Sequence, residues 1–204
     1  SLREKTPMKR HSIIALTGIL LAPSAFAKPL EIVIHHRYGE APLLMESARY
    51  ETAAKETFSV TRLAYLLSNF SLEREDGTLV KLDEFAFVEA HQQSSFSLTT
   101  APSGSFRALH FDVGLGAETN HSDSARFAAG HPLNPLLNRL HWDWEGGYIF
   151  FAIEGHFKAP DQASAGYVYH VARDLNRTRM SVTAPIDLRD PGRLHLVLDV
   201  DRKS

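Results

Sequence analysis

Apolar and polar residues alternate along several short stretches of this chain, a pattern typical of β-strands that bury one face. Residues 30–36 show it most clearly, with Leu30, Ile32 and Ile34 on one face and Glu31 on the other. Further strands are predicted at residues 58–72, 79–88, 106–115, 147–157, 167–172, 180–186 and 194–200. The first of these, residues 58–72, also fits a helix that turns into a strand.

Turn signals separate these segments. Asp76-Gly77 predicts a tight hairpin, and Asp190-Pro191-Gly192 predicts a turn before the last strand. Only residues 50–55 and 132–140 have a helical pattern, and both segments are short. Regularly spaced short strands without a repeat or a linker predict an all-β fold, a single-domain antiparallel β-sandwich with a long, partly irregular insertion.

That insertion is the polar region of residues 116–146. A segment of this length with little regular structure is usually functional or disordered, and its two tryptophans argue against disorder. If the segment is extended, Trp142 and Trp144 place both indoles on one side. The aromatic pair then has two further interpretations, namely packing at the end of the sandwich and a platform on which a carbohydrate stacks.

The first residues predict export. Met8-Lys9-Arg10 is a short positive region, residues 12–22 are largely apolar, and Ala25-Phe26-Ala27 has small residues where a signal peptidase reads. We therefore predict residues 1–27 to be an upstream segment plus a signal peptide cleaved after Ala27, with an uncleaved anchor as the alternative. The remaining domain, residues 28–204, is expected to be periplasmic or secreted and to have no membrane span.

Composition excludes several function classes. The 204 residues carry a net charge of −2 with Lys and Arg scattered along the chain, so no nucleic-acid partner is expected. The sequence has no cysteine, which excludes disulfides, thiolate metal sites and cysteine nucleophiles. Neither a Gly-x-Ser-x-Gly elbow nor a His-Glu-x-x-His motif is present, so a hydrolase is disfavoured.

Histidine is abundant, with eleven in the chain. Imidazole is the commonest side-chain metal ligand. By strand parity His36 faces the core, whereas His35 shares the polar face with Glu31 and His110 and His195 face solvent.

Strand parity leaves two more histidines as candidate metal ligands. His91 shares a face with Phe85 and Phe87 if that strand continues, and the parity of His170 near its strand end is open. A metal site requires at least two of these imidazoles to converge, whereas a metal-free binding module requires only Trp142 and Trp144.

Motifs along most of the chain resemble those of one family. In chain order they are Leu66-Leu67-Ser68-Asn69-Phe70-Ser71-Leu72 with Asp76-Gly77, residues 106–114, Asn120-His121-x-Asp123, His131-Pro132-Leu133-Asn134, Trp142-x-Trp144-x-x-Gly147-Tyr148-x-Phe150, and Tyr169-His170-Val171. The block from Asn120 to Tyr148 is the most specific. On these motifs, residues 29–201 resemble the MbnP-like family of exported proteins.

The resemblance implies a copper-binding protein that takes part in copper acquisition or handling and is not itself an enzyme, so no catalytic residue is expected. It implies a di-haem partner of the MauG/MbnH type and a tryptophan, Trp142 or Trp144, oxidised to kynurenine at the metal. His36 and His170 are the first candidates for copper ligands, followed by His121 and His91. The four-cysteine motif of many relatives is absent here, so sulfur ligation by cysteine is not part of this expectation.

Overall fold

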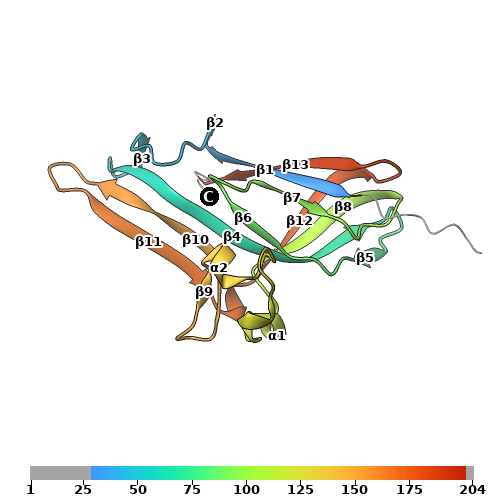
Figure 1. The fold of residues 1–204 in the computed structure, drawn as a ribbon. Helices are drawn as coiled ribbons and strands as arrows, with labels where there is room; N and C mark the ends of the chain where they lie inside the picture. The colour runs from blue at the N-terminus through green and yellow to red at the C-terminus, as the bar shows by residue number, and fades with distance from the viewer. Residues whose placement is uncertain (1–28, 201–204) are drawn as a thin grey trace, which may run out of the picture.

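The computed structural model describes residues 29–200, which form two β-sheets packed face to face (Figure 1). The predicted signal peptide and its cleavage point lie outside the described residues. The smaller sheet is built on β1 (Leu30–Tyr38), which pairs with β13 (Gly192–Asp199), β7 (Ser95–Leu98) and β2 (Ala41–Pro42). In the described part of the chain, no helix is long and apolar enough to cross a membrane.

The larger sheet is organised by one long strand, β4 (Thr57–Glu73). Along one edge it pairs first with β10 (Gly147–Lys158) and then with β8 (Ser105–Val113). Its other edge carries β3 (Tyr50–Glu51), β6 (Ala86–Glu89) and β5 (Leu79–Lys81).

The sheet forks at the middle of β4. Pairing with β10 ends at Tyr65 and pairing with β8 begins at Leu67. Each of these two strands carries one more strand, β11 (Ala165–Ala172) on β10 and β12 (Thr178–Asp187) on β8. Figure 1 shows the resulting arms diverging, β10 and β11 to the left and β8 and β12 to the right.

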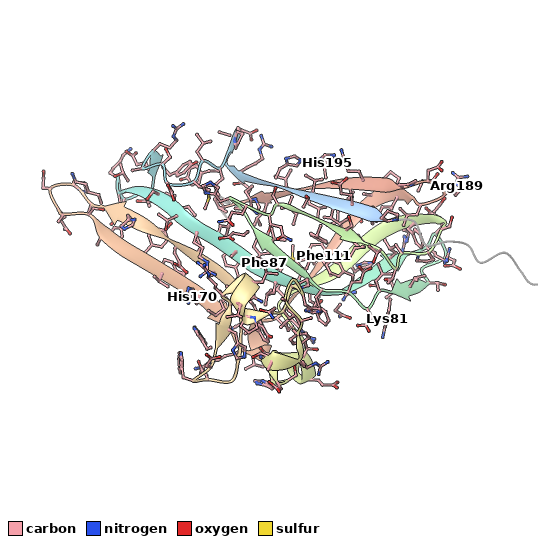
Figure 2. All side chains as sticks on the ribbon, viewed as in Figure 1. Lys81, Phe87, Phe111, His170, Arg189 and His195 are labelled. Carbon is pink, nitrogen blue, oxygen red and sulfur yellow. The ribbon has the colours of Figure 1, made fainter. Side chains whose placement is uncertain are left out.

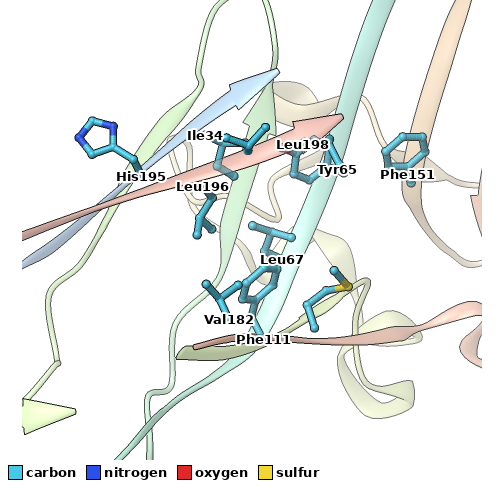
Figure 3. Close-up of a pocket in the computed structure, with 11 residues that line it drawn as sticks. Ile34, Tyr65, Leu67, Phe111, Phe151, Val182, His195, Leu196 and Leu198 are labelled. Atoms are coloured by element: carbon cyan, nitrogen blue, oxygen red, sulfur yellow. The ribbon is translucent and has the colours of Figure 1, made fainter. Parts of the chain in front are cut away.

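An apolar pocket of about 270 Å³ lies at this fork, under the smaller sheet (Figure 3). Its walls include Tyr65, Leu67, Phe111, Phe151 and Leu196. The polar side chains in its walls are Tyr65 and, at the rim, His195, and the rest of the lining is apolar, so the pocket is not a candidate for metal chemistry.

Burial on both faces explains the apolar run within β4. Leu63, Tyr65 and Leu67 enter the core between the two sheets, whereas Ala64 and Leu66 enter a second core on the opposite face. The second core is completed by Phe127, Leu133 and Leu140 of the irregular segment and by Leu115 and Tyr148, which flank it. A strand covered on both faces has no polar side to show in its sequence.

The irregular segment contains only short elements. They are α1 (Ala117–Asn120), a 3₁₀ turn at Ser124–Arg126, α2 (Pro135–Asn138) and β9 (His141–Trp142); a second 3₁₀ turn, Asp174–Asn176, follows β11. The lone turn of α2 is capped by Asn134, whose side chain accepts a hydrogen bond from the Leu136 amide.

The all-β sandwich is confirmed, and the segment predicted as strand or helix is one strand, β4. Two predictions were wrong in detail and a third was right only in part. Residues 50–55 form no helix, because Thr52 and Glu56 close a turn in which Lys55 has a φ of 65°. Residues 132–140 contain only the single turn of α2, and β1 and β13 pair in parallel, so the smaller sheet is not wholly antiparallel.

The predicted strand at residues 79–88 is two strands, β5 and β6. Between them the Leu82 amide donates to the Phe70 carbonyl, and the Glu84 carboxylate accepts bonds from the amides of Thr99 and Thr100. The Leu82 bond still attaches the chain to β4, whereas the Glu84 bonds hold the next residues against Thr99 and Thr100, outside the β4 ladder. The short strand β7 was not predicted at all, since Ser95–Leu98 has too few residues for a pattern.

The register of β10 depends on a glycine. A Cβ at Gly155 would lie 1.9 Å from the Ser59 carbonyl oxygen and 2.7 Å from the Tyr167 hydroxyl. We expect Gly155→Ala to destabilise the fold by about 1–3 kcal/mol or more, as overpacking does, measured by urea unfolding. Gly166→Ala on β11, where the nearest atom is 3.7 Å away, is the control. Equal losses in both variants would contradict this account.

Candidate functional site

The strongest candidate site lies where the β9–β10 hairpin meets β11. Trp142 ends β9, residues 143–146 form the turn, and Gly147 begins β10. The two indoles lie on one side of this hairpin, with ring centroids 5.2 Å apart and planes inclined by 33°. The two indoles therefore lie on the same side, as predicted, but a turn of the chain brings them together and not an extended strand.

The two tryptophans differ in their surroundings. Trp142 is half-buried, packs against the second core and lies with its ring centroid 6.0 Å from that of His170. Trp144 is 78% exposed and its one described ring contact is with Trp142. Only Trp142 is thus placed beside a potential metal ligand.

His170 reaches this position from the middle of β11, paired with Ala152 of β10. Its Nε2 lies 2.9 Å from the Glu154 carboxylate, which also accepts from the Arg62 guanidinium at 3.0 Å. Burial alone would raise the pKa of Glu154, but the bonds from His170 and Arg62 outweigh it and lower the pKa. Glu154 is therefore an ionised acceptor.

The charge on Glu154 determines the tautomer of His170. A carboxylate can only accept, so Nε2 must carry the proton and donate. Neutral His170 then presents a lone pair at Nδ1, which makes no hydrogen bond to the residues that the structure describes. A carboxylate on one ring nitrogen with the other free is the usual arrangement behind a metal-bound histidine.

His121 borders the adjacent pocket, a space of about 380 Å³ that Trp142 and Asp174 also line. Its Nδ1 lies 3.1 Å from the Gly146 carbonyl oxygen and its Nε2 lies 3.1 Å from the Asp174 carboxylate. The bond to Gly146 and then the bond to Asp174 raise the pKa of His121. Both nitrogens face acceptors, so binding a metal would require this ring to give up one of those bonds.

The motif asparagine next to His121 is structural. Asn120 is buried, its Oδ1 accepts from the Tyr148 amide at 2.8 Å, and its Nδ2 donates to Asp174 at 2.8 Å. The Tyr148 hydroxyl donates to the Leu133 carbonyl at 2.7 Å, and burial raises the pKa of this tyrosine to about 12. These bonds fasten the irregular segment to the start of β10 and so hold the hairpin that carries Trp142.

His36 is buried, as its parity predicts, but it lies apart from this site. It sits on β1 in the smaller sheet, and its Nε2 lies 2.9 Å from the Tyr65 hydroxyl. Burial and, second, the nearby His35 lower the pKa of His36 to about 4. The structure therefore does not bring His36 and His170 together, and His36 is a neutral core histidine with a partner.

His91 also lies apart. The strand that should have carried it, β6, ends at Glu89, and a turn closed between Glu89 and Gln93 leaves His91 exposed. His110 differs from its prediction too, because it is half-buried with Nε2 2.8 Å from Glu73 and Nδ1 2.8 Å from Ser181. Parity within β8 did not anticipate that Glu73 of β4 and Ser181 of β12, on the strands at either side, would half-bury this ring.

Sequence reasoning missed Glu154 and His141. The role of Glu154 depends on its neighbour across the strands, which the sequence does not show. His141 is enclosed by Asp143, 3.0 Å from its Nδ1, and by Tyr148, but only once the hairpin has formed.

Among residues 29–200, no three or more His, Asp or Glu side chains gather in a geometry that could hold a metal ion. The described site thus offers His170 and the Trp142 ring, but not a complete set of protein ligands.

Comparison with known proteins adds the following. A family model described as MbnP matches residues 27–203. The solved structure of MbnP from Methylosinus trichosporium is similar with a TM-score of 0.55 at 15% identity, covering 82% of this chain and 75% of that one. At that identity the likeness concerns the fold alone. No curated protein matches the sequence.

The buried, neutral His36 makes stability depend on pH. In the unfolded chain its pKa is near 6.5 and in the fold about 4, so between these values the unfolded state binds more protons. Stability is full above pH 6.5 and falls as the pH drops towards 4, by up to about 2 kcal/mol after allowance for solvent screening.

The check is urea unfolding at pH 7 and pH 4 for the wild type, His36→Gln and, as an exposed control, His91→Gln. Glutamine does not titrate, so His36→Gln should lose about 2 kcal/mol less than the wild type between the two pH values. An unchanged pH dependence in His36→Gln would show that another group is responsible.

Proposed function

Because the chain belongs to the MbnP family, we propose that it is an exported copper-binding protein whose copper centre forms where Trp142 meets His170. One observation carries the proposal. Glu154 holds His170 as the Nε2–H tautomer, which leaves Nδ1 as a lone-pair donor on the histidine that contacts Trp142. An imidazole with few other donors around it suits copper, Cu(I) in particular.

Oxidation of Trp142 would supply the donors that the unmodified chain lacks. Two oxygen atoms from peroxide or dioxygen add across the C2–C3 bond of the indole, which breaks to give N-formylkynurenine. Water then releases formate and leaves kynurenine, with an aryl amine and a ketone that tryptophan does not have. A di-haem partner of the MauG/MbnH type is the proposed source of the oxidising equivalents.

The position of Trp144 fits this sequence of events. Its exposed ring touches the half-buried Trp142, so a bulky partner can approach Trp144 where it cannot surround Trp142. His121, at the rim of the neighbouring pocket, is the next candidate ligand if its bond to Asp174 or Gly146 opens. The protein's role is then to hold and hand on copper, and the chemistry on the indole belongs to the partner.

The exposure of Trp144 and of Tyr169 on β11 supports a second candidate, a metal-free module that stacks a sugar or a peptide. The two candidates make different demands on the protein. The module needs neither oxidation nor copper, and it needs both indoles intact.

The first test is co-expression with a di-haem partner, followed by intact mass and copper content. We expect a mass gain of about 4 Da, the difference between tryptophan and kynurenine, mapped to residue 142, with one Cu(I) per chain. Trp142→Phe should lose the mass gain and the bound Cu(I), whereas Trp144→Phe should keep residue 142 as the modified position. Absence of copper in every maturation state would refute the copper proposal and leave the stacking module to be tested with a glycan array.

The second test concerns the tautomer of His170. Glu154→Gln replaces a fixed acceptor by an amide that can also donate, so Nε2–H is no longer enforced. We expect copper affinity of the matured protein to fall about 10–100-fold, as is usual when the carboxylate behind a histidine ligand is lost, measured by competition with a Cu(I) chelator. Glu118→Gln, on the exposed side of α1, is the control, and equal affinities in the two variants would contradict the assignment.

A further inference from the structure

A pair of histidines lies on the outer face of the smaller sheet, away from the Trp142 site. His35 of β1 and His195 of β13 are both exposed, on the faces that their strand parity predicts. Figure 2 shows His195 on the upper side of the molecule and His170 on the lower, and in Figure 3 the His195 ring points away from the apolar pocket. This pair therefore belongs neither to the core nor to the site described above.

The two imidazoles converge nitrogen to nitrogen. His35 Nε2 lies 2.8 Å from His195 Nδ1, with the ring centroids 5.1 Å apart and the planes within 12°. The parallel register explains the contact, because His35 pairs with Val197 and His195 with Val33, which makes the histidines diagonal neighbours on one face. Without a metal, such a pair shares a single proton between its two nitrogens.

We propose that His35 and His195 form a two-histidine site for Cu(II). Bonds of about 2.0 Å from imidazole nitrogen to a metal, set at a right angle, place two nitrogens about 2.8 Å apart. The pair already has that separation, so binding requires the exposed rings to tilt and the shared proton to leave. No main-chain movement is needed.

The acidic side chains near this pair already have partners and do not supply further ligands. Glu31, on the same face, is held in an ion pair by Arg193, and the Asp199 carboxylate accepts a bond from the Gly39 amide at 3.0 Å. The described chain thus supplies two nitrogen ligands, and water completes the sphere. Among the common divalent ions, Cu(II) binds such a nitrogen set most tightly and accepts a tetragonal geometry with two cis imidazoles.

Metal binding at this pair would also stabilise the fold. Its two ligands are 160 residues apart in the chain and meet only when β13 lies against β1. A metal that binds this pair binds the folded protein more tightly than the unfolded chain, so the stabilisation of the fold grows with the logarithm of the free metal concentration over its dissociation constant. Bound Cu(II) would link β1 to β13, the first and last strands that the structure describes.

The test uses the mature chain, without a histidine tag and without the di-haem partner, so that Trp142 stays unmodified. Cu(II) is titrated while the electron paramagnetic resonance spectrum and the melting temperature are recorded. We expect one Cu(II) per chain with hyperfine coupling to two imidazole nitrogens and a rise in melting temperature. His35→Gln and His195→Gln should each weaken binding by more than about tenfold and remove the rise.

Two matched variants separate this site from the alternatives. His91→Gln removes another exposed histidine and should bind Cu(II) like the wild type, and His170→Gln removes the ligand of the proposed copper centre and tests whether Cu(II) is held there instead. Equal weakening by His91→Gln would mean scattered surface binding and would overturn the proposal. Weakening by His170→Gln alone would place the Cu(II) at the Trp142 site and overturn it as well, whereas failure of tryptophan oxidation would refute only the proposed function.

Discussion

Burial of β4 on both faces is the constraint on which the rest of this molecule depends. One face closes the core between the two sheets, and the other forms a second core with the irregular segment. A long strand with two apolar faces would expose the Leu66 side if that segment were absent, and burying such surface is the main source of stability in a fold without disulfides. The irregular segment is therefore as much a structural layer as the smaller sheet.

The second core also positions the candidate site. Tyr148 and Leu140 are buried in it, and they flank the turn that bears Trp142 and Trp144. Buried polar groups complete the attachment: Asn120 joins the Tyr148 amide to Asp174, and Asn138 accepts from the Leu140 amide at 2.7 Å. Satisfied polar networks of this kind select one geometry rather than adding much stability, which suits a hairpin that must hold an indole against His170.

Protonation distinguishes the histidines more sharply than exposure does. His36 is neutral because it is buried against Tyr65, His121 is favoured as a cation because both nitrogens face acceptors, and His170 donates its Nε2 proton to an ionised Glu154. Only the last state leaves a nitrogen that can ligate a metal without breaking an existing bond. The Glu154 carboxylate, which no pattern in the sequence singles out, thus sets the orientation of the His170 proton beside Trp142.

The sequence by itself determined the all-β class, most strand positions and the family, because alternation, turn residues and ordered motifs are local properties. It also determined which faces His35, His36 and His195 occupy, since parity within a strand needs no partner. Tertiary structure alone decided which histidines meet: the fork of β4, the parallel pairing of β1 with β13 and the early end of β6 are contacts between distant segments. For that reason His36 and His91 lie apart from the Trp142 site, Glu154 enters it, and His35 finds His195 across 160 residues.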